Sequence, residues 1–319
     1  MRTLKTGAPG QRALAAAQSY GAFIVLALIL AMNALLTPNF LRLGTAWNML
    51  LQSFPIIIMS LGMAMVIATG GIDISVGSVM AIGSIIFAKL SLESGWSILA
   101  AALAALGVTF CVGLFNGLLV GKFGFQPIVV TLVTMMIGRG AAAVINDGKI
   151  VTFYDSNLVD FGLHQVFGAV PIHIVIILAA VVAVYLLVKE TVFGIYLQAV
   201  GDNLRAARLV GVNAFRVILV VYAVNAFLAG FAAIFETARL ASADAINLGK
   251  LVEMDCIAAV AVGGTPMRGG QVRIISTLAG ALTMQAITTM VNMNNIPYAY
   301  SLVIKSVIIV VALSVQKEE

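Results

Sequence analysis

The sequence predicts an all-α polytopic membrane protein of about ten transmembrane helices, with both termini in the cytoplasm. The first observation behind this prediction is composition: 61% of the 319 residues are hydrophobic and 10% are charged, whereas a soluble domain carries roughly 25% charged residues. The second is a succession of apolar runs separated by short polar turns. The third is a pair of Gly-Gly loops, at residues 70–71 and 263–264, which divide two apolar regions into short or broken helices.

Charged residues predict how the chain lies in the lipid bilayer. The formal net charge is +5, but the basic residues are spread over loops, so the charge indicates orientation in the membrane and no nucleic-acid partner. Most loop cations fall on the predicted inner side, and the clear exceptions are Arg42, Lys149, Arg239 and Lys250. We expect residues 1–319 to form a single transmembrane domain, with a cytoplasmic tail at 1–19 and a cytoplasmic segment at 189–216.

The first half of the chain contains predicted spans at residues 20–36, 47–69, 78–90, 97–120 and 127–145. Pro55 predicts a kink in the second of them. The fourth contains Gly107, Gly113 and Gly117, and small residues let helix backbones approach closely in lipid. Cys111 in this span, like Cys256 later in the chain, is expected to be a small buried apolar side chain.

The first Gly-Gly loop separates the second and third spans. It comprises Gly70, Gly71, Asp73, Ser75 and Gly77, with isoleucine and valine between them. Irregular backbone at membrane depth persists only where protein or a water-filled cavity covers it, and an intramembrane carboxylate indicates a functional site. Asp73 and Ser75 either bond a polar substrate during passage or cap the start of the third span. We favour the cap or gate.

Four neutral polar side chains lie inside predicted spans, namely Asn116, Thr131, Thr134 and Gln285. They are donors and acceptors suited to an uncharged polyol in a substrate pathway. Each of them can equally bond a neighbouring helix, so the sequence leaves both roles open.

The second half contains predicted spans at residues 170–188, 217–235, 274–291 and 298–315, with a short apolar piece at 251–262. That piece ends in Gly263-Gly264, followed by Gly270, as residues 66–69 end in Gly70-Gly71, followed by Gly77. Matching interruptions in two halves of a chain indicate a transport pathway, and the alternative is a chance match in a chain with 30 glycines. The second loop has no carboxylate, so the glycines are the shared element.

The cytoplasmic segment carries one predicted short helix over residues 201–211, which either docks on a partner or lies on the membrane surface. Asp202 or Asn203 caps its start and Gly211 ends it.

Lys305 lies in the middle of the last predicted span, where an unpaired lysine costs ~2.5–3.5 kcal/mol or more. Glu253 or Asp255 is its expected partner.

No catalytic set is visible in the sequence. It lacks a Walker lysine loop and the metalloprotease and serine-hydrolase motifs, and its two histidines match no metal spacing. We therefore expect no enzyme activity, no cofactor and no metal. Energy for uphill transport would come from an ion gradient or from a partner.

Several ordered motifs resemble those of permease subunits of bacterial ABC importers for monosaccharides, in the ribose, xylose and galactofuranose branch. They are Gly-Ile-Asp-Ile-Ser-Val-Gly at 71–77, Gln-Pro-Ile-Val-Val-Thr-Leu at 126–132 with Arg139-Gly140, Ala-Val-Gly-Asp-Asn at 199–203, Ala-Ala-Arg at 206–208, Gly-Val-Asn at 211–213, Glu-Met-Asp-Cys-Ile-Ala-Ala-Val at 253–260 and Gly-Gly-Thr at 263–265. Residues 68–77 and 148–153 look most like galactofuranose permeases.

This resemblance implies a multi-pass protein of the bacterial cytoplasmic (inner) membrane. Its implied partners are cytosolic ABC ATPase subunits, an extracytoplasmic sugar-binding protein and a second permease, identical or related. The helix that fits the ATPase would carry Gly201, Asp202, Asn203, Ala206, Ala207, Arg208 and Gly211. The chain departs from the family pattern at Pro266, Met267 and Arg268, and at Met284, Gln285, Thr288 and Thr289, which puts the identity of the sugar in doubt.

The alternatives are an ABC permease for a nucleoside or an amino acid, and an ion-coupled secondary transporter that works alone.

Overall fold

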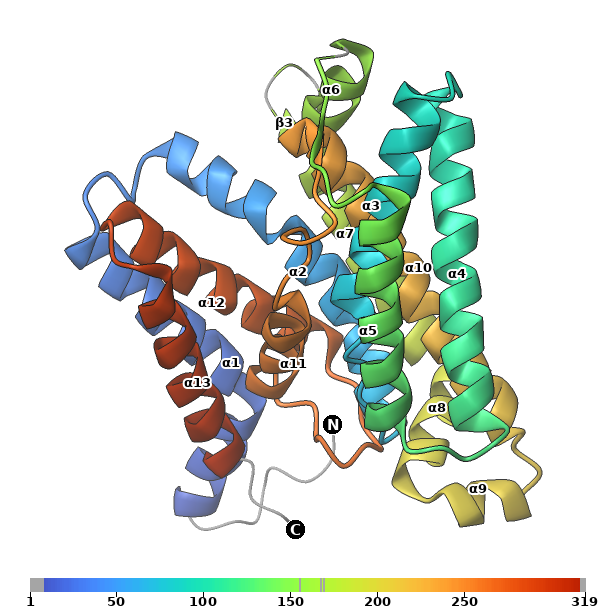
Figure 1. Ribbon diagram of the computed structural model, residues 1–319. Coiled ribbons are helices and arrows are strands. Elements are labelled where there is room, and N and C mark those ends of the chain that lie inside the picture. The colour runs from blue at the N-terminus through green and yellow to red at the C-terminus, as the bar shows by residue number, and fades with distance from the viewer. Residues whose placement is uncertain (1–8, 155, 167, 169, 316–319) are drawn as a thin grey trace.

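The computed structural model describes residues 9–154, 156–166, 168 and 170–315 (Figure 1). Its helices before the mid-chain loop are α1 (Pro9–Leu36), α2 (Leu43–Ala68), α3 (Val76–Leu92), α4 (Ile98–Gly121) and α5 (Pro127–Ile145). Those after it are α6 (Ser156–Leu163), α7 (Ile172–Lys189), α8 (Val192–Asp202), α9 (Leu204–Leu209), α10 (Ala214–Leu240), α11 (Val252–Val262), α12 (Ile274–Met293) and α13 (Tyr298–Val315). The described residues thus form an all-α architecture of apolar helices.

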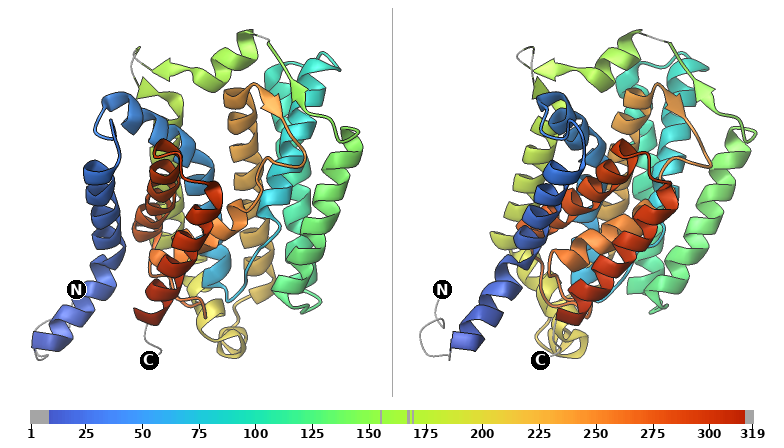
Figure 2. Two further views of the ribbon diagram at one scale, coloured as in Figure 1. Left: turned by 60° about the vertical axis from the view of Figure 1, so that its left-hand side comes forward. Right: turned by 90° about the vertical axis from the view of Figure 1, so that its left-hand side faces the viewer.

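Four two-residue strands are the only ones in the described part of the chain. They are β1 (Val151–Thr152), β2 (Gln165–Val166), β3 (Val170–Pro171) and β4 (Ser242–Ala243). β1 pairs with β4 and β2 with β3, both antiparallel. The β1–β4 pair and α6 lie at one end of the molecule, and α9 lies at the other with the start of α1 and the end of α13 (Figure 2).

Among the described residues, six helices are long and apolar enough to cross a membrane, namely α2, α4, α5, α7, α10 and α12. Three shorter apolar stretches accompany them, at Tyr20–Leu36, Val76–Leu92 and Tyr298–Val310. α11 has only 11 residues and ends just before Gly263, so it is too short to cross the membrane alone. The structure is therefore that of a polytopic membrane protein.

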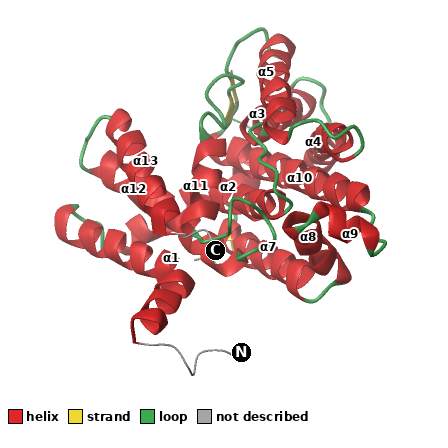
Figure 3. Cartoon of the chain, turned by 90° about the horizontal axis from the view of Figure 1, so that it is seen from below, coloured by secondary structure: helices red, strands yellow, loops and turns green. Residues whose placement is uncertain are grey.

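The helices form two groups around a shared centre. Seen from the end that carries α9, α1, α12 and α13 lie on one side and α3, α4, α5 and α10 on the other (Figure 3). α2 is the most enclosed span, with 83% of its most apolar window buried, against 22% for α4. The outer faces of α4, α5 and α7 are apolar and exposed, as expected of surfaces that meet lipid.

Small residues of α4 let it pack closely against α10. The sequence predicts such an approach at three glycines of α4, and two of them make the contact. A Cβ at Gly113 would lie 2.7 Å from the Ala226 side chain, and one at Gly117 would lie 2.8 Å from the Leu219 Cα. A Cβ at Gly107 would meet nothing within 4 Å, so this glycine is not part of the contact. Cys111 on the same helix is exposed, which makes the prediction of a buried side chain wrong for Cys111 and right for Cys256.

Most predicted spans match observed helices within a few residues, and the fifth and last have the predicted bounds. The helix of the first span starts earlier, at Pro9, so helix continues into the predicted tail. α2 passes through Pro55 without ending. The predicted cytoplasmic residues 1–8 and 316–319 lie outside the described part of the chain.

Candidate functional site

The first Gly-Gly loop ends α2 in a main-chain motif. The Gly71 N–H donates to the Val66 carbonyl oxygen over 3.2 Å and the Gly70 N–H to Ile67 over 2.9 Å. Gly70 has φ of +81°, in the left-handed region. These two bonds and a left-handed glycine define a Schellman motif, in which glycine avoids the Cβ clash of that conformation. The glycines therefore form the break itself.

Asp73 is the centre of a buried polar network that follows this break. Its Oδ1 accepts hydrogen bonds from the Ser75 backbone N–H at 2.9 Å and the Ser75 hydroxyl at 2.6 Å. Its Oδ2 accepts one from the Asn225 amide at 2.9 Å. All three side chains are 0% exposed. The carboxylate therefore bonds the loop and α10 in this conformation.

The network continues into α4 and α5. The Asn116 amide donates to the Ser75 hydroxyl oxygen at 3.0 Å, and the Thr134 hydroxyl donates to the Asn116 carbonyl oxygen at 2.6 Å. The Ile74 N–H donates to the Thr131 hydroxyl oxygen at 3.1 Å. Three of the neutral polar residues singled out from the sequence thus meet at the first break, bonded to protein groups.

One expectation for this loop is wrong in detail. Ser75 is the N-cap residue of α3, but its side chain makes no capping bond to the helix, because its hydroxyl bonds Asp73 and Asn116 instead. Asp73 bonds the Ser75 N–H, which precedes the first turn of α3.

Gln285 lies apart from this network. Its amide donates to the Gln52 side-chain oxygen at 3.2 Å and to the Thr289 hydroxyl at 3.4 Å. These contacts join α12 to α2, and none of its described bonds reaches Asp73.

The second Gly-Gly loop ends α11 in the same motif. The Thr265 N–H donates to Val260 over 3.3 Å and the Gly264 N–H to Ala261 over 2.9 Å, and Gly264 has φ of +75°. Gly264 thus corresponds to Gly70, one residue later than the sequence match suggests. The match stops at the helix end, because the next helix starts at Val76 after the first break and only at Ile274 after the second.

The two breaks meet each other at the end of α8. The Gly270 N–H donates to the Ala68 carbonyl oxygen over 2.9 Å. A Cβ at Gly201 would overlap that same oxygen and would lie 2.7 Å from the Gly270 nitrogen. We call this meeting of Ala68, Gly201 and Gly270 the glycine junction. It places three backbones in direct contact without intervening side chains.

The segment after α7 differs from the predicted single helix. Gly201 and Asp202 belong to the end of α8, and the separate short helix α9 begins only at Leu204. The division occurs because Asn203 is extended, with φ of −152°, and its side chain accepts from the N–H groups of Arg205 and Ala206. Asn203 is therefore the cap and Asp202 is not.

α9 lies at the end of the molecule, with a small buried side and a large exposed one. Ala207 is 4% exposed, whereas Leu209 and Val210 are 88% and 79% exposed. Ala206 and Arg208 are also exposed, and Gly211 has φ of +85° in the turn that leads to α10. The exposed apolar pair is a candidate contact for a partner.

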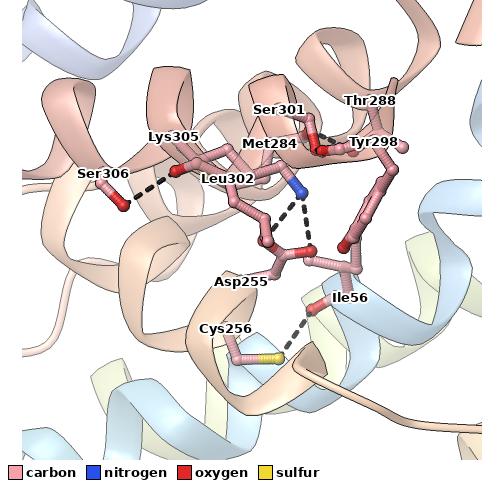
Figure 4. A network of polar contacts seen from close by, with 10 residues as sticks. All are labelled: Ile56, Asp255, Cys256, Met284, Thr288, Tyr298, Ser301, Leu302, Lys305 and Ser306. Atoms are coloured by element: carbon pink, nitrogen blue, oxygen red, sulfur yellow. Dashed lines mark hydrogen bonds and ion pairs between the residues drawn. The ribbon is translucent and has the colours of Figure 1, made fainter. Parts of the chain in front are cut away.

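The lysine in the last helix is paired with Asp255. The Lys305 ammonium lies 2.8 Å from both carboxylate oxygens, and the side chains are 4% and 16% exposed. Figure 4 shows the pair between α11 and α13. Glu253, the other candidate, instead lies next to α3, where a Cβ at Gly77 would come within 2.5 Å of its Oε2.

Sequence reasoning missed two buried residues of α10 near Asp73. Asn225 bonds the carboxylate, and the Tyr222 hydroxyl lies 2.6 Å from the position of a Cβ at Gly71. Asn225 was detectable as an amide within an apolar run. Among the described residues, no three His, Cys, Asp or Glu side chains are grouped to hold a metal ion.

The sequence of the chain is similar to those of known transport permeases. The family described as branched-chain amino acid transport system permease component matches residues 45–313. The galactofuranose transporter permease protein of Escherichia coli is 35% identical, over 92% of this chain and 88% of its own. The ribose import permease protein of Bacillus subtilis is 32% identical over 95% and 94%, and the fructose import permease protein of Bifidobacterium longum is 36% identical over 76% and 69%. No solved structure matches the chain.

Proposed function

The chain belongs to the family described as branched-chain amino acid transport system permease component, and we propose that it is the transmembrane subunit of an ATP-driven importer for a monosaccharide. An extracytoplasmic binding protein delivers the sugar, and ATP hydrolysis takes place in a separate cytosolic subunit. The observation that carries the proposal is the match, over nine-tenths of the chain, to permeases named for galactofuranose and ribose.

The proposed topology has ten membrane segments in one transmembrane domain of the bacterial cytoplasmic (inner) membrane. The nine apolar stretches supply nine of them, and α11 is the tenth, entering as a half-helix. Both termini lie on the cytoplasmic side together with α8 and α9. Arg205 and Arg208 on α9 support this orientation, because positively charged loops stay inside.

The proposed pathway runs beside the first break. Gly70, Gly71, Asp73, Ser75 and Gly77 shape the break, and helices that stop and restart at membrane depth mark pathways in other transporters. Three side chains of its hydrogen-bond network, Asn116, Thr131 and Thr134, are neutral donors and acceptors. Gln285 is a second polar point, on the α2–α12 side. In the proposed importer these groups gate the passage or bond sugar hydroxyls weakly.

An amino acid is the second candidate cargo, because the family description names one. A zwitterion favours charged partners in the membrane. The intramembrane charges of Lys305 and Asp255 satisfy each other at 2.8 Å and are buried. This pair is therefore not available to bind a zwitterion.

The proposed coupling runs through the glycine junction. An ATPase subunit would contact α9 through Leu209 and Val210, which are exposed. Gly201 lies in the last turn of α8, three residues before α9 begins, and it contacts the ends of both breaks. A displacement of α8 would therefore move both loops together. A second permease, either a copy or a relative, completes the pathway from the other side.

Reconstitution tests the function. The permease is placed in liposomes with the ATPase and binding protein encoded beside it, and uptake of labelled pentoses, hexoses and leucine is measured. We expect uptake of one sugar only, dependent on ATP and on the binding protein. A matched preparation contains an ATPase variant that binds but does not hydrolyse ATP.

Two results would contradict the proposal. Uptake by the permease alone under an ion gradient would identify a secondary transporter. Uptake of leucine, with none of any sugar, would identify an amino acid permease.

A further inference from the structure

We propose that residues 244–251 are a re-entrant gate at the end of the pathway opposite to α9, and that Arg139 is the residue that positions it. This segment joins β4 to α11. Its position as a gate rests on the proposed function, whereas its attachment to Arg139 rests on the contacts alone.

The segment brings non-helical backbone deep into the molecule. It starts at β4, which pairs with β1 beyond the end of α5. At Gly249 it contacts Gly77, in the first turn of α3, which lies about 22 Å along the helix axis from Leu92 at a rise of 1.5 Å per residue. Irregular backbone at such depth is stable only when protein covers it or when it lines a water-filled cavity.

Local bonds keep the segment compact. Asp244 Oδ1 accepts from the N–H groups of Ile246 and Asn247 at 2.8 and 3.0 Å. The Leu248 N–H donates to the Asp244 carbonyl oxygen at 3.1 Å, and the Lys250 N–H to Asn247 at 3.1 Å. Four main-chain N–H groups are thus bonded within the segment. Because of these bonds, the segment can move as one unit.

Arg139 of α5 attaches this unit to the helices. Its Nη1 donates to the carbonyl oxygens of Leu248 at 2.6 Å and Ala245 at 3.2 Å. It forms no ion pair with a carboxylate of the described residues. A guanidinium in a membrane span is expensive and marks function. Its hydrogen bonds go to main-chain oxygens of a loop, and the nearby carboxylates of Glu253 and Asp244 stabilise its charge without forming an ion pair. Such an attachment can be broken and remade.

Two glycines make a close contact at the end of the segment that leads into α11. A Cβ at Gly77 would overlap the Gly249 carbonyl oxygen, and a Cβ at Gly249 would lie 2.5 Å from the Gly77 oxygen. The contact is therefore possible only between glycines.

The segment has one buried and one exposed side. Ala245, Leu248 and Gly249 are buried against α3 and α5, and Ile246, Asn247 and Lys250 are exposed. Release of Arg139 and Gly77 would expose the start of α3, next to the Asp73 network. The segment thus covers the entry to the polar part of the pathway.

Hydrogen exchange of peptides from residues 244–251 in the assembled importer tests this gate. Arg139→Met removes both hydrogen bonds of Nη1, and Gly77→Ala displaces the segment sterically. We expect exchange to accelerate at least about tenfold in Arg139→Met, since one hydrogen bond to a charged group accounts for about this factor. Exchange should also accelerate in Gly77→Ala, since the added Cβ overlaps the Gly249 carbonyl oxygen. Arg139→Lys, which keeps a charged donor, should restore part of the protection.

Gly140→Ala is the matched control, because this neighbour of Arg139 has nothing within 4 Å of an added Cβ. It should exchange as the unmodified protein does, and peptides of α2 should be unchanged in every variant. In the unmodified importer, a non-hydrolysable ATP analogue and the loaded binding protein should also accelerate exchange in 244–251. This measurement does not depend on whether Arg139→Met assembles.

Unchanged exchange in Arg139→Met or Gly77→Ala would overturn the role of these residues. Unchanged exchange in the trapped importer would overturn the gate. Uptake without an ATPase would refute the proposed function and leave the attachment of the segment to Arg139 intact.

Discussion

The buried ion pair of Lys305 and Asp255 predicts that single substitutions lower the free energy of unfolding and that double substitutions restore it. Both atom pairs are 2.8 Å apart and both side chains are more than four-fifths buried. Removal of one partner leaves the other charge buried, which costs about 3–5 kcal/mol. We therefore expect Asp255→Leu and Lys305→Met each to lower the free energy of unfolding by that amount.

The double variant Asp255→Leu with Lys305→Met should lie within about 1 kcal/mol of the unmodified protein, because well-packed apolar residues can replace a buried ion pair without loss. The reversed pair, Asp255→Lys with Lys305→Glu, should recover assembly relative to its single variants. The assay is unfolding of the purified permease in mixed micelles, followed by circular dichroism and analysed as a double-mutant cycle.

Lys89 and Glu93 provide the control, since their side chains are 30% and 54% exposed at 3.3 Å. Loss of such an exposed pair should change the unfolding free energy by less than about 1 kcal/mol. If the effects at Lys305 and Asp255 add to within about 0.5 kcal/mol, the two residues are not coupled. That result would refute the pairing.

Three further predictions concern the polar network and the coupling segment. Gly201→Ala should leave the complex assembled but lower sugar moved per ATP by about tenfold, because an added Cβ overlaps the Ala68 oxygen; a normal ratio would contradict the junction. Asp73→Asn should cost about 1 kcal/mol in thermal unfolding, whereas Asp73→Leu, which leaves three donors without an acceptor, should cost roughly 3 kcal/mol or more. Leu209→Asp should weaken ATPase binding in pull-down titrations without changing the melting temperature, since this side chain is 88% exposed.

Local signals in the sequence predict most helices. The last span was predicted over the residues that form α13, because a continuous apolar run between polar turns leaves few alternatives in lipid. The break after α2 was also predictable, since adjacent glycines and a carboxylate interrupt that run. Asn203, by contrast, divides a predicted helix in two, and either Asp202 or Asn203 suits a cap.

The site depends on long-range contacts that sequence spacing does not contain. Asn225 bonds Asp73 across 152 positions, and Arg139 bonds Leu248 across 109. A lysine within a membrane span predicts a nearby carboxylate partner. The choice between Glu253 and Asp255, however, depends on which side of α11 faces α13. The one-residue offset between the two Gly-Gly loops likewise follows from which glycine is left-handed.

The glycine junction has a consequence for how such a permease can diversify. Its three members touch through a carbonyl oxygen, an amide and a position where no side chain fits. Substitutions along the pathway change side chains and leave these main-chain atoms in place. In the proposed importer, substitutions at positions such as Asn116 or Thr134 can therefore change the preferred cargo while the main-chain contact between α8 and the two breaks stays the same.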